Sequence, residues 1–250
     1  MTGVQYGAAV SRVYDRMFAD PTPTTTTVQQ LLPHLRGRDV LELGVGTGRI
    51  AVPVADAARS ITGVDNSPDM LRAFRDKGVP DNVTLVEADF RDPLSDRLGG
   101  RFGAAYSTLG SMACCLTRDE LRAALGHVRD VLHPGAVFCM EYYARELYLE
   151  VIRATGGVMS AALPGGEKMQ TRLTVAADSD IMTATTTVYA GDEPVRFAEQ
   201  VLLLDSAEIA GLMRHAGFAA VHVTHGPGQP FIWYVAETPG TQHERTESTP

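Results

Sequence analysis

The chain has 250 residues, of which 44% are hydrophobic and 21% charged, and these values are typical of a globular domain with a well-buried core. The formal net charge of −8 argues against nucleic-acid and anionic-membrane partners. No apolar run approaches the roughly 18 residues of a membrane span, and charges interrupt the N-terminal segment where a signal peptide would be apolar, so we expect a cytoplasmic protein. The cysteines Cys114, Cys115 and Cys139 fit neither a disulfide framework nor a zinc site.

The first predicted element is a helix over "AAVSRVYDRMFAD", which contains Tyr14. Its apolar residues Val10, Val13, Met17 and Phe18 recur at helical spacing and would lie on one buried face. We therefore assign residues 1–27 to an N-terminal helical segment.

From residue 28 to residue 149, apolar strand-like runs alternate with helical patterns. The strands are expected at 39–43, 60–65, 82–89, 102–109 and 136–143. The helices are expected at 48–58, at 67–78 and from Thr117 to a stop at Pro134-Gly135, the last with a capping box of Thr117 and Glu120. Buried strands separated by helices predict right-handed βαβ units and a parallel sheet, an α/β fold.

The pattern changes after Leu149. Three Thr- and Val-rich runs between 168 and 204 follow one another without helices, which predicts an antiparallel insertion over residues 150–200. A helix at 206–218 and a hairpin through Gly226-Pro227-Gly228 return the chain to the core, so the core comprises 28–149 and 201–238. The polar segment 239–250 is expected to be disordered.

A glycine turn follows the first strand in "VLELGVGTGRI". No lysine follows the glycines, which excludes a phosphate loop, and the spacing Gly44-x-Gly46-x-Gly48 lacks the third position of G-x-G-x-x-G. Glu42 would also place a carboxylate beside a pyrophosphate, which is the wrong sign of charge. The turn instead suits a cationic ligand in close contact with the backbone.

This stretch resembles the first motif of class I S-adenosylmethionine (SAM)-dependent methyltransferases, and the order of elements agrees over roughly residues 28–237. The resemblance implies a Rossmann-like, seven-stranded, mostly parallel sheet with a terminal antiparallel hairpin and the insertion as a lid. It also implies that Asp65 binds the ribose hydroxyls, that Asp89 and Phe90 of "EADF" bind the adenine, and that SAM is converted to S-adenosylhomocysteine (SAH). The cofactor-binding residues expected on this basis are Tyr14, Glu42, Gly44, Gly46, Thr47, Gly48, Arg49, Asp65, Asn66, Met70, Asp89, Phe90 and Ser107.

The segment "STLGSMACC" after the fourth strand bears on the acceptor. It lacks the [DN]-P-P-[YFW] motif of DNA amino-methyltransferases and the acidic residues with which catechol-type enzymes bind magnesium, so we expect neither a nucleic acid nor a metal. The insertion and the "YD" helix are similar to bacterial natural-product methyltransferases, including amino-sugar N-methyltransferases. Several of these have His where Cys114 aligns, so the most obvious base is absent.

The expected function is methyl transfer to N, O or C of a small molecule of secondary metabolism. The remaining candidates for catalysis are Glu141, Tyr142, Tyr143 and His225. Arg172 and Arg196 on the insertion could meet an anionic acceptor, although solvated strand faces are the simpler interpretation. Two alternatives stay open, a SAM-binding protein without methyl transfer and an NAD(P)-dependent oxidoreductase. The exposed strands of the insertion could also form a homodimer interface.

Overall fold

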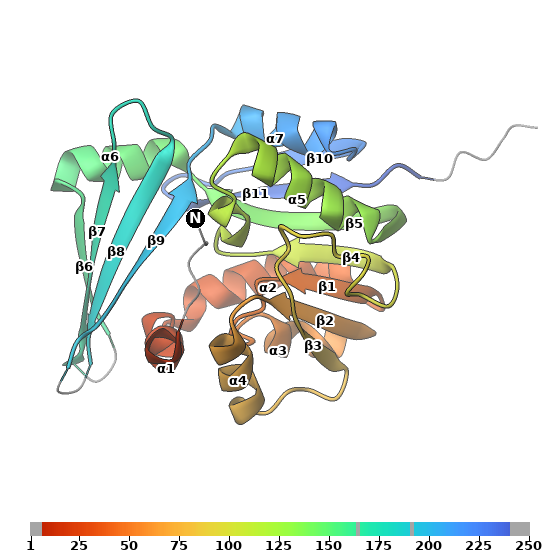
Figure 1. Ribbon diagram of the computed structural model, residues 1–250, viewed down its shortest axis with the longest axis horizontal. Coiled ribbons are helices and arrows are strands. Elements are labelled where there is room, and N and C mark those ends of the chain that lie inside the picture. Colours follow the sequence, from red (N-terminus) through yellow and green to blue (C-terminus); the bar gives the residue numbers. More distant parts are fainter. Residues whose placement is uncertain (1–6, 164–165, 191–192, 241–250) are drawn as a thin grey trace, which may run out of the picture.

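The computed structural model describes residues 7–163, 166–190 and 193–240, and its strands form two separate sheets (Figure 1). The larger sheet has seven strands in the order β10-β11-β5-β4-β1-β2-β3. Its strands are β1 Asp39–Leu43, β2 Ser60–Asp65, β3 Val83–Glu87, β4 Phe102–Ser107, β5 Leu132–Tyr143, β10 Ala220–Thr224 and β11 Phe231–Glu237. Strands β1 to β5 pair with one another in parallel, whereas β11 is antiparallel to both β5 and β10, which confirms the predicted α/β class and the terminal hairpin.

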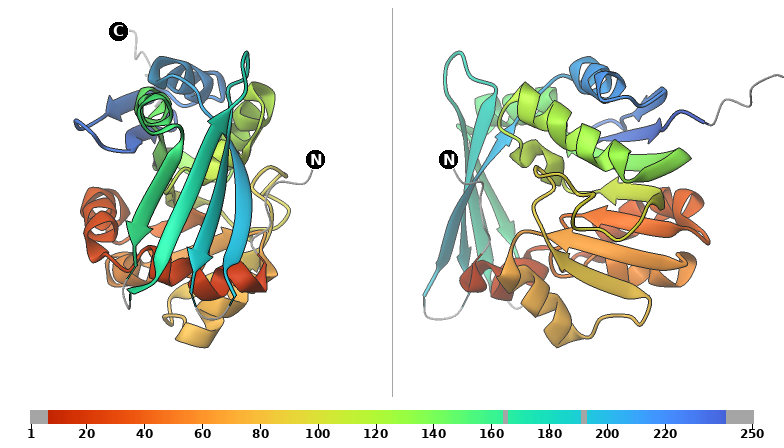
Figure 2. Two further views of the ribbon diagram at one scale, coloured as in Figure 1. Left: turned by 90° about the vertical axis from the view of Figure 1, so that its left-hand side faces the viewer. Right: turned by 45° about the vertical axis from the view of Figure 1, so that its right-hand side comes forward.

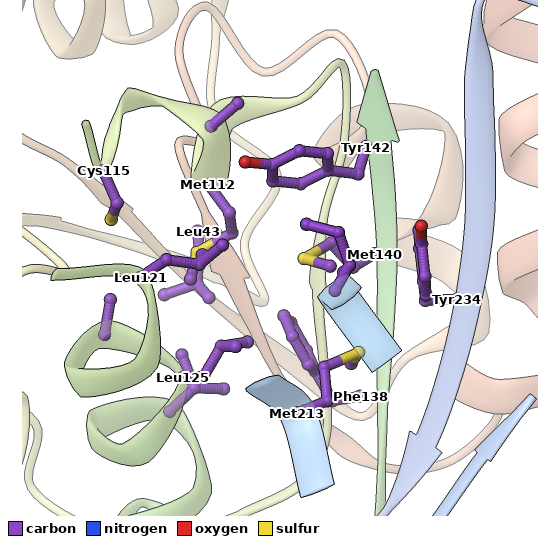
Figure 3. Close-up of a cluster of buried hydrophobic side chains, with 14 of the residues drawn as sticks. Leu43, Met112, Cys115, Leu121, Leu125, Phe138, Met140, Tyr142, Met213 and Tyr234 are labelled. Carbon is purple, nitrogen blue, oxygen red and sulfur yellow. The ribbon is translucent and has the colours of Figure 1, made fainter. Parts of the chain in front are cut away.

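Helices cover both faces of this sheet. The helices α2 (Pro21–Leu35), α3 (Ala51–Val54) and α4 (Pro68–Lys77) lie on one face, and α5 (Arg118–Asp130) and α7 (Ser206–His215) lie on the other. Successive residues of β1 alternate between the two buried clusters, since Leu41 and Leu43 pack with α5 and α7 whereas Val40 packs with α2. Figure 3 shows part of the cluster under α5 and α7.

Two predicted helix boundaries differ from the structure. The helix expected at 48–58 is a single α-helical turn at Ala51–Val54 followed by a 3₁₀ turn at Ala55–Ala57. Thr117 caps α5 as expected, with its Oγ1 accepting from the N–H of Glu120, but the Glu120 carboxylate accepts from the N–H of Leu116 and so closes the box one residue earlier than expected. However, α5 ends at Asp130, and Pro134-Gly135 lies inside β5. The register between β5 and β4 shifts at this point, opposite Phe102 to Ala104, and the bulge accommodates the N–H that Pro134 lacks.

The smaller sheet is antiparallel, in the order β6-β7-β8-β9. Its strands are β6 Val158–Ala162, β7 Lys168–Val175, β8 Ile181–Tyr189 and β9 Val195–Leu202, and α6 (Arg145–Thr155) leads into it. It stands against the end of the larger sheet at which the parallel strands have their carboxyl termini, with α1 (Ala8–Met17) between it and α4 (Figures 1 and 2). The insertion was predicted from β7, β8 and β9, whereas α6 and β6 were not.

The helix α2 was also missed, because "PTPTTTTVQQLLPHL" is rich in Thr and Pro, which favour helices weakly. Asp20 caps it by accepting from the N–H of Thr22 at 2.9 Å, and Leu31 and Leu35 are fully buried on its inner face. The boundary proposed at residue 27 falls inside this helix. Residues 241–250 of the proposed tail lie outside the described part of the chain.

Candidate functional site

The candidate site lies at the carboxyl ends of β1 to β5, which is where open parallel sheets bind ligands. The loops after β1 to β4 and the last residue of β5 contribute backbone or side-chain atoms to one pocket, here called the glycine-turn pocket. Its described lining residues are Tyr14, Gly44, Gly46, Asp65, Asn66, Met70, Asp89, Phe90, Arg91, Leu109, Gly110, Ser111, Cys114, Tyr143, Glu199 and Val201.

The glycine turn approaches its neighbours too closely for side chains. Gly44 has φ of +74°, and a Cβ there would lie 2.7 Å from Ser111 Oγ. The N–H of Gly46 donates to Asp65 Oδ2 at 2.8 Å, and the N–H of Ser67 donates to Asp65 Oδ1 at 2.9 Å. Burial raises the pKa of Asp65, although these two backbone hydrogen bonds oppose the shift. Asp65 therefore both braces the turn and presents a carboxylate to the pocket.

Gly48 has a different role from Gly44 and Gly46. It does not line the glycine-turn pocket, and a Cβ at its position would lie 2.4 Å from the ring of Phe74 on α4. Its φ is +82°. Gly48 therefore lets the turn pack directly on α4.

Asp89 reaches the pocket with its acceptor positions largely occupied. Arg91 Nε donates to Asp89 Oδ1 at 2.9 Å, the N–H of Arg91 donates to the same oxygen at 2.9 Å, and Asn66 Nδ2 donates to Oδ2 at 3.1 Å. Burial alone would raise the pKa of Asp89, but the hydrogen bonds from Arg91 and Asn66 lower it. Phe90 and Met70 complete this wall, and Met70 is 2% exposed.

A smaller recess behind the glycine turn contains Glu42, Thr47 and Arg49, and Tyr14 also lines it. Burial raises the pKa of Glu42 to about 8, and the hydroxyl of Tyr106 donates a hydrogen bond to its carboxylate, which opposes the shift. Thr47 Oγ1 donates to Asp15 Oδ1 at 2.6 Å and thereby ties α1 to the turn.

Arg49 connects the same turn to the N-terminal region. Its guanidinium donates to Thr24 Oγ1 at 2.9 Å and lies 5.1 Å from the centroid of the Phe18 ring.

A second cavity, of about 300 Å³, lies between α1 and the inner face of the four-stranded sheet, and we call it the apolar cavity. It shares Tyr14, Leu109, Tyr143 and Glu199 with the glycine-turn pocket, so the two spaces adjoin. The rest of its described lining is Met17, Phe18, Tyr148, Met159, Ser160, Ala161, Met169, Thr171, Leu173, Met182, Ala184, Thr186, Phe197 and Phe231.

Of the four catalytic candidates, the structure brings only Tyr143 to these spaces. Tyr142 is fully buried in the cluster of Figure 3, where its hydroxyl donates to the carbonyl of Leu202 at 2.7 Å. The carboxylate of Glu141 accepts from Thr27 Oγ1 at 2.7 Å and from the N–H of Leu109 at 2.8 Å, so it holds α2 and the loop after β4 in place. Tyr142 and Tyr143 are adjacent and therefore face opposite sides of β5. The register of the sheet decides which of the two faces the cavity.

The fourth candidate, His225, is exposed on the hairpin between β10 and β11. Its Nε2 pairs with the carbonyl of Gln229 at 2.9 Å. Ser107, expected at the cofactor, is fully buried at the end of β4 and does not line either space. Arg172 and Arg196 are exposed, so they do not meet a ligand in the apolar cavity.

Several lining residues had not been expected, among them Arg91, Ser111 and Glu199. Arg91 lies in a loop and Ser111 begins a single 3₁₀ turn, so no periodicity marks either of them. Glu199 had a detectable signal, because in "VRFAEQVL" it falls on the same face of β9 as Phe197 and Val201, a carboxylate in an apolar row. Within the described ranges, no three His, Cys, Asp or Glu side chains gather as metal ligands, and no helix is long and apolar enough to cross a membrane.

Comparison with known proteins agrees with this geometry. Residues 40–135 match a family model described as a methyltransferase domain. The cypemycin N-terminal methyltransferase of a Streptomyces species is 26% identical over 231 residues, covering 90% of this chain and 92% of the relative. The dTDP-3-amino-3,4,6-trideoxy-alpha-D-glucopyranose N,N-dimethyltransferase of Streptomyces venezuelae is 34% identical over 102 residues, 41% of each chain.

Solved structures share the whole architecture. The CcbJ methyltransferase of Streptomyces caelestis superposes with a TM-score of 0.79 at 21% identity, covering 96% of this chain and all of that one (100%). DesVI of Streptomyces venezuelae gives a TM-score of 0.71 at 24% identity, with coverage of 94% and 100%. These likenesses show that the four-stranded sheet belongs to a fold shared with both structures.

Proposed function

Since the chain contains a class I SAM-dependent methyltransferase domain, we propose that it transfers a methyl group from SAM to a small molecule held in the apolar cavity. Similar proteins include an N,N-dimethyltransferase of a dTDP-linked amino sugar and an amino pentose methyltransferase involved in calicheamicin biosynthesis, and we place the acceptor of this chain in the broad class of small molecules of secondary metabolism.

The glycine-turn pocket fits the cofactor. SAM carries a sulfonium-activated methyl group on a nucleoside without phosphate, and it supplies that methyl group as the electrophile. The gap between Gly44 and Ser111, which a Cβ would fill, gives the ligand direct access to the backbone. In this proposal Asp65 accepts hydrogen bonds from the ribose hydroxyls, and Met70, Asp89 and Phe90 surround the adenine.

The remaining expected contacts lie on the other side of the glycine turn. Tyr14, Thr47 and Arg49 would surround the methionyl part, with Glu42 as the carboxylate nearest to its cationic groups. Burial raises the pKa of Glu42 to about 8, so a cationic group beside it would favour its ionised form, whereas a pyrophosphate would oppose ionisation.

The observation that carries the proposal is the shared wall of the two spaces. Tyr14, Leu109 and Tyr143 line both the glycine-turn pocket and the apolar cavity. A molecule in the cavity would therefore lie against the methyl-donating end of the cofactor.

Methyl transfer is an in-line displacement, so alignment and exclusion of water are the main contributions required of the protein. Holding two reactants in line can lower the barrier by about 7–11 kcal/mol. The aromatic walls of Tyr14, Tyr143 and Tyr148 would supply this alignment and exclude water.

The proposal is tested by measuring SAH binding by calorimetry and transfer of labelled methyl from SAM to a panel of small amines, phenols and alcohols. Ala184→Trp would fill the apolar cavity, because Ala184 is 5% exposed and lines it. We expect this variant to bind SAH and to lose methyl transfer. Ala198→Trp, on the exposed face of β9, is the matched control and should keep both. A wild-type protein that does not bind SAH would contradict the proposal.

A further inference from the structure

The apolar cavity has a single charged side chain among its described lining residues. Its described lining is aromatic, aliphatic or hydroxylic except for one carboxylate, Glu199, and it includes no Lys, Arg or His. The hydroxyls of Thr171 and Thr186 on its floor are 3.0 Å apart and bond to each other. The only charged group that a bound molecule can meet among these residues is therefore negative.

The fold directs Glu199 inward. Along β9, Phe197, Glu199 and Val201 share one face, and Arg196, Ala198 and Gln200 share the exposed one. Glu199 is half-buried and lines both the apolar cavity and the glycine-turn pocket, together with Tyr14 and Tyr143. It therefore lies at the junction where acceptor and methyl donor would meet.

The neighbouring side chains experience this negative charge. Burial, and after it the charge of Glu199, raises the pKa of both Tyr143 and Tyr148. Burial also raises the pKa of Cys114 to about 12, with the charge of Glu199 as the next contribution. These tyrosines and this thiol stay protonated at neutral pH, so none of them adds a second negative charge beside Glu199.

We propose that the acceptor of this enzyme is an amine with an apolar body, and that the carboxylate of Glu199 binds its nitrogen at the junction of the two spaces. This inference rests on the proposed function and assigns its substrate class. A buried cation needs an opposite charge, and Glu199 provides it. The faces of Tyr14, Tyr143 and Tyr148 add attraction for an ammonium group, which a neutral alcohol would not receive.

The reaction balances with these groups alone. The bound ammonium gives one proton to the Glu199 carboxylate, which passes it to water. The freed lone pair on nitrogen forms the N–C bond while the S–C bond breaks and sulfur keeps the electron pair. The products are the protonated N-methylated acceptor and SAH, whose sulfur is now a neutral thioether. The ammonium group of the methylated acceptor can again pair with Glu199.

A competing role for Glu199 is binding of the cofactor, since it also lines the glycine-turn pocket. The two roles differ in a binding measurement, because SAH retains the methionyl ammonium group but occupies no part of the acceptor site. The test therefore separates binding of SAH from binding of an amine to the SAH-loaded protein.

The probes are phenethylamine, which is a cation at pH 7, and 2-phenylethanol, its neutral counterpart of similar size. For the SAH-loaded wild type, calorimetry or ligand-observed NMR should give at least tenfold tighter binding of phenethylamine. Glu199→Gln should lose this preference while keeping the affinity for SAH within about twofold. Glu199→Asp retains the charge and should keep much of the preference.

Glu193→Gln is the matched control, since Glu193 precedes β9 and is exposed. It should behave as the wild type. The proposal is overturned if the wild type does not prefer the amine, if it binds neither probe at millimolar concentration, or if Glu199→Gln keeps the preference. A large loss of SAH affinity in Glu199→Gln would assign the carboxylate to the cofactor instead. If the wild type does not bind SAH at all, the proposed function itself has failed. That result differs from a wrong acceptor class, in which SAH binds but the preference for the amine is absent.

Discussion

The hydroxyl of Tyr106 on β4 donates a 2.7 Å hydrogen bond to the carboxylate of Glu42 on β1, and the two side chains are 0% and 2% exposed. The strands are parallel neighbours, with Glu42 directly beside Tyr106 in register. Burial of Glu42 disfavours its charged form, and this outweighs the hydrogen bond, so its pKa rises to about 8. In the ligand-free protein Glu42 is thus largely protonated at pH 7.

This relationship predicts a pH-dependent effect of Glu42→Gln on stability. The folded protein holds the proton up to about pH 8, whereas the unfolded chain releases it near the ordinary glutamate pKa of 4.5. The contribution of Glu42 is fully present below pH 4.5 and is lost as the pH rises to 8. Glu42→Gln should therefore stabilise the protein relative to wild type at pH 9 but not at pH 4.5.

Because one pKa unit corresponds to about 1.4 kcal/mol, the difference between the two pH values should reach a few kcal/mol. Denaturant unfolding at both values measures it. The exposed Glu87→Gln is the control and should show no such dependence. Equal effects of Glu42→Gln at both pH values would contradict the shifted pKa.

The contact between Thr47 and Asp15 predicts a kinetic effect. Thr47 is 1% exposed, and its hydroxyl ties α1 to the glycine turn through Asp15, whose other oxygen accepts from Lys77 on α4 at 2.6 Å. Thr47→Val removes the hydrogen bond but keeps the shape of the side chain. If the barrier to SAH release falls by the roughly 1 kcal/mol that such a hydrogen bond contributes, SAH should dissociate roughly fivefold faster. Stopped-flow measurement of SAH release tests this, with Thr26→Val as an exposed control. An unchanged rate would show that α1 does not retain the cofactor.

Asp65→Asn should weaken SAH binding by about 10- to 100-fold, as expected for loss of a charge-assisted hydrogen bond of about 1.5–3 kcal/mol. An amide has one acceptor oxygen, so it cannot both brace the N–H groups of Gly46 and Ser67 and accept from the ribose. Calorimetry measures the affinity, and the melting temperature reports any loosening of the turn. Asp69→Asn on α4, whose carboxylate pairs with Arg72, is the control. Equal SAH affinities of the two variants would show that Asp65 does not bind the ribose.

Gly48→Ala and Gly37→Ala form a matched pair for the packing of the glycine turn. Both glycines have positive φ, +82° and +66°, but a Cβ at Gly48 meets Phe74 whereas nothing lies within 4 Å of one at Gly37. Gly48→Ala should therefore destabilise by about 1–3 kcal/mol more than Gly37→Ala, the typical cost of overpacking. Phe74→Leu should recover part of the difference in the Gly48→Ala background. Equal losses in chemical denaturation would mean that backbone conformation alone matters.

The homodimer expected from the sequence stays a prediction. The edge strand β6 has the sequence "VMSAA" without a charge, and Met159 within it is 44% exposed. Such an edge is prone to pair with another strand. Sedimentation at micromolar concentration should show a species of twice 26.9 kDa, and a 26.9 kDa species would count against it.

The site was predictable where local backbone demands fix the residue type. The spacing of the glycines was visible in the sequence, and the resemblance to class I methyltransferases predicted Asp65 and Asp89, both of which the structure places on the glycine-turn pocket. The strands β1 to β5 were visible as well, since their apolar runs must be buried on both faces. The segment α2 could not be read, because its Thr-rich helix is stabilised by packing of Leu31 and Leu35 and not by propensity.

What the sequence by itself determined is the glycine turn, the parallel sheet and the class of ligand, since these depend on spacing within a few residues. Only the tertiary structure decided the acceptor side. The register of β5 turned Tyr143 toward the cavity and Tyr142 into the core, and the pleat of β9 brought Glu199 to the glycine turn, about 150 residues away in the chain. Such contacts depend on how two sheets pack together, which the alternation of residues within one strand does not specify.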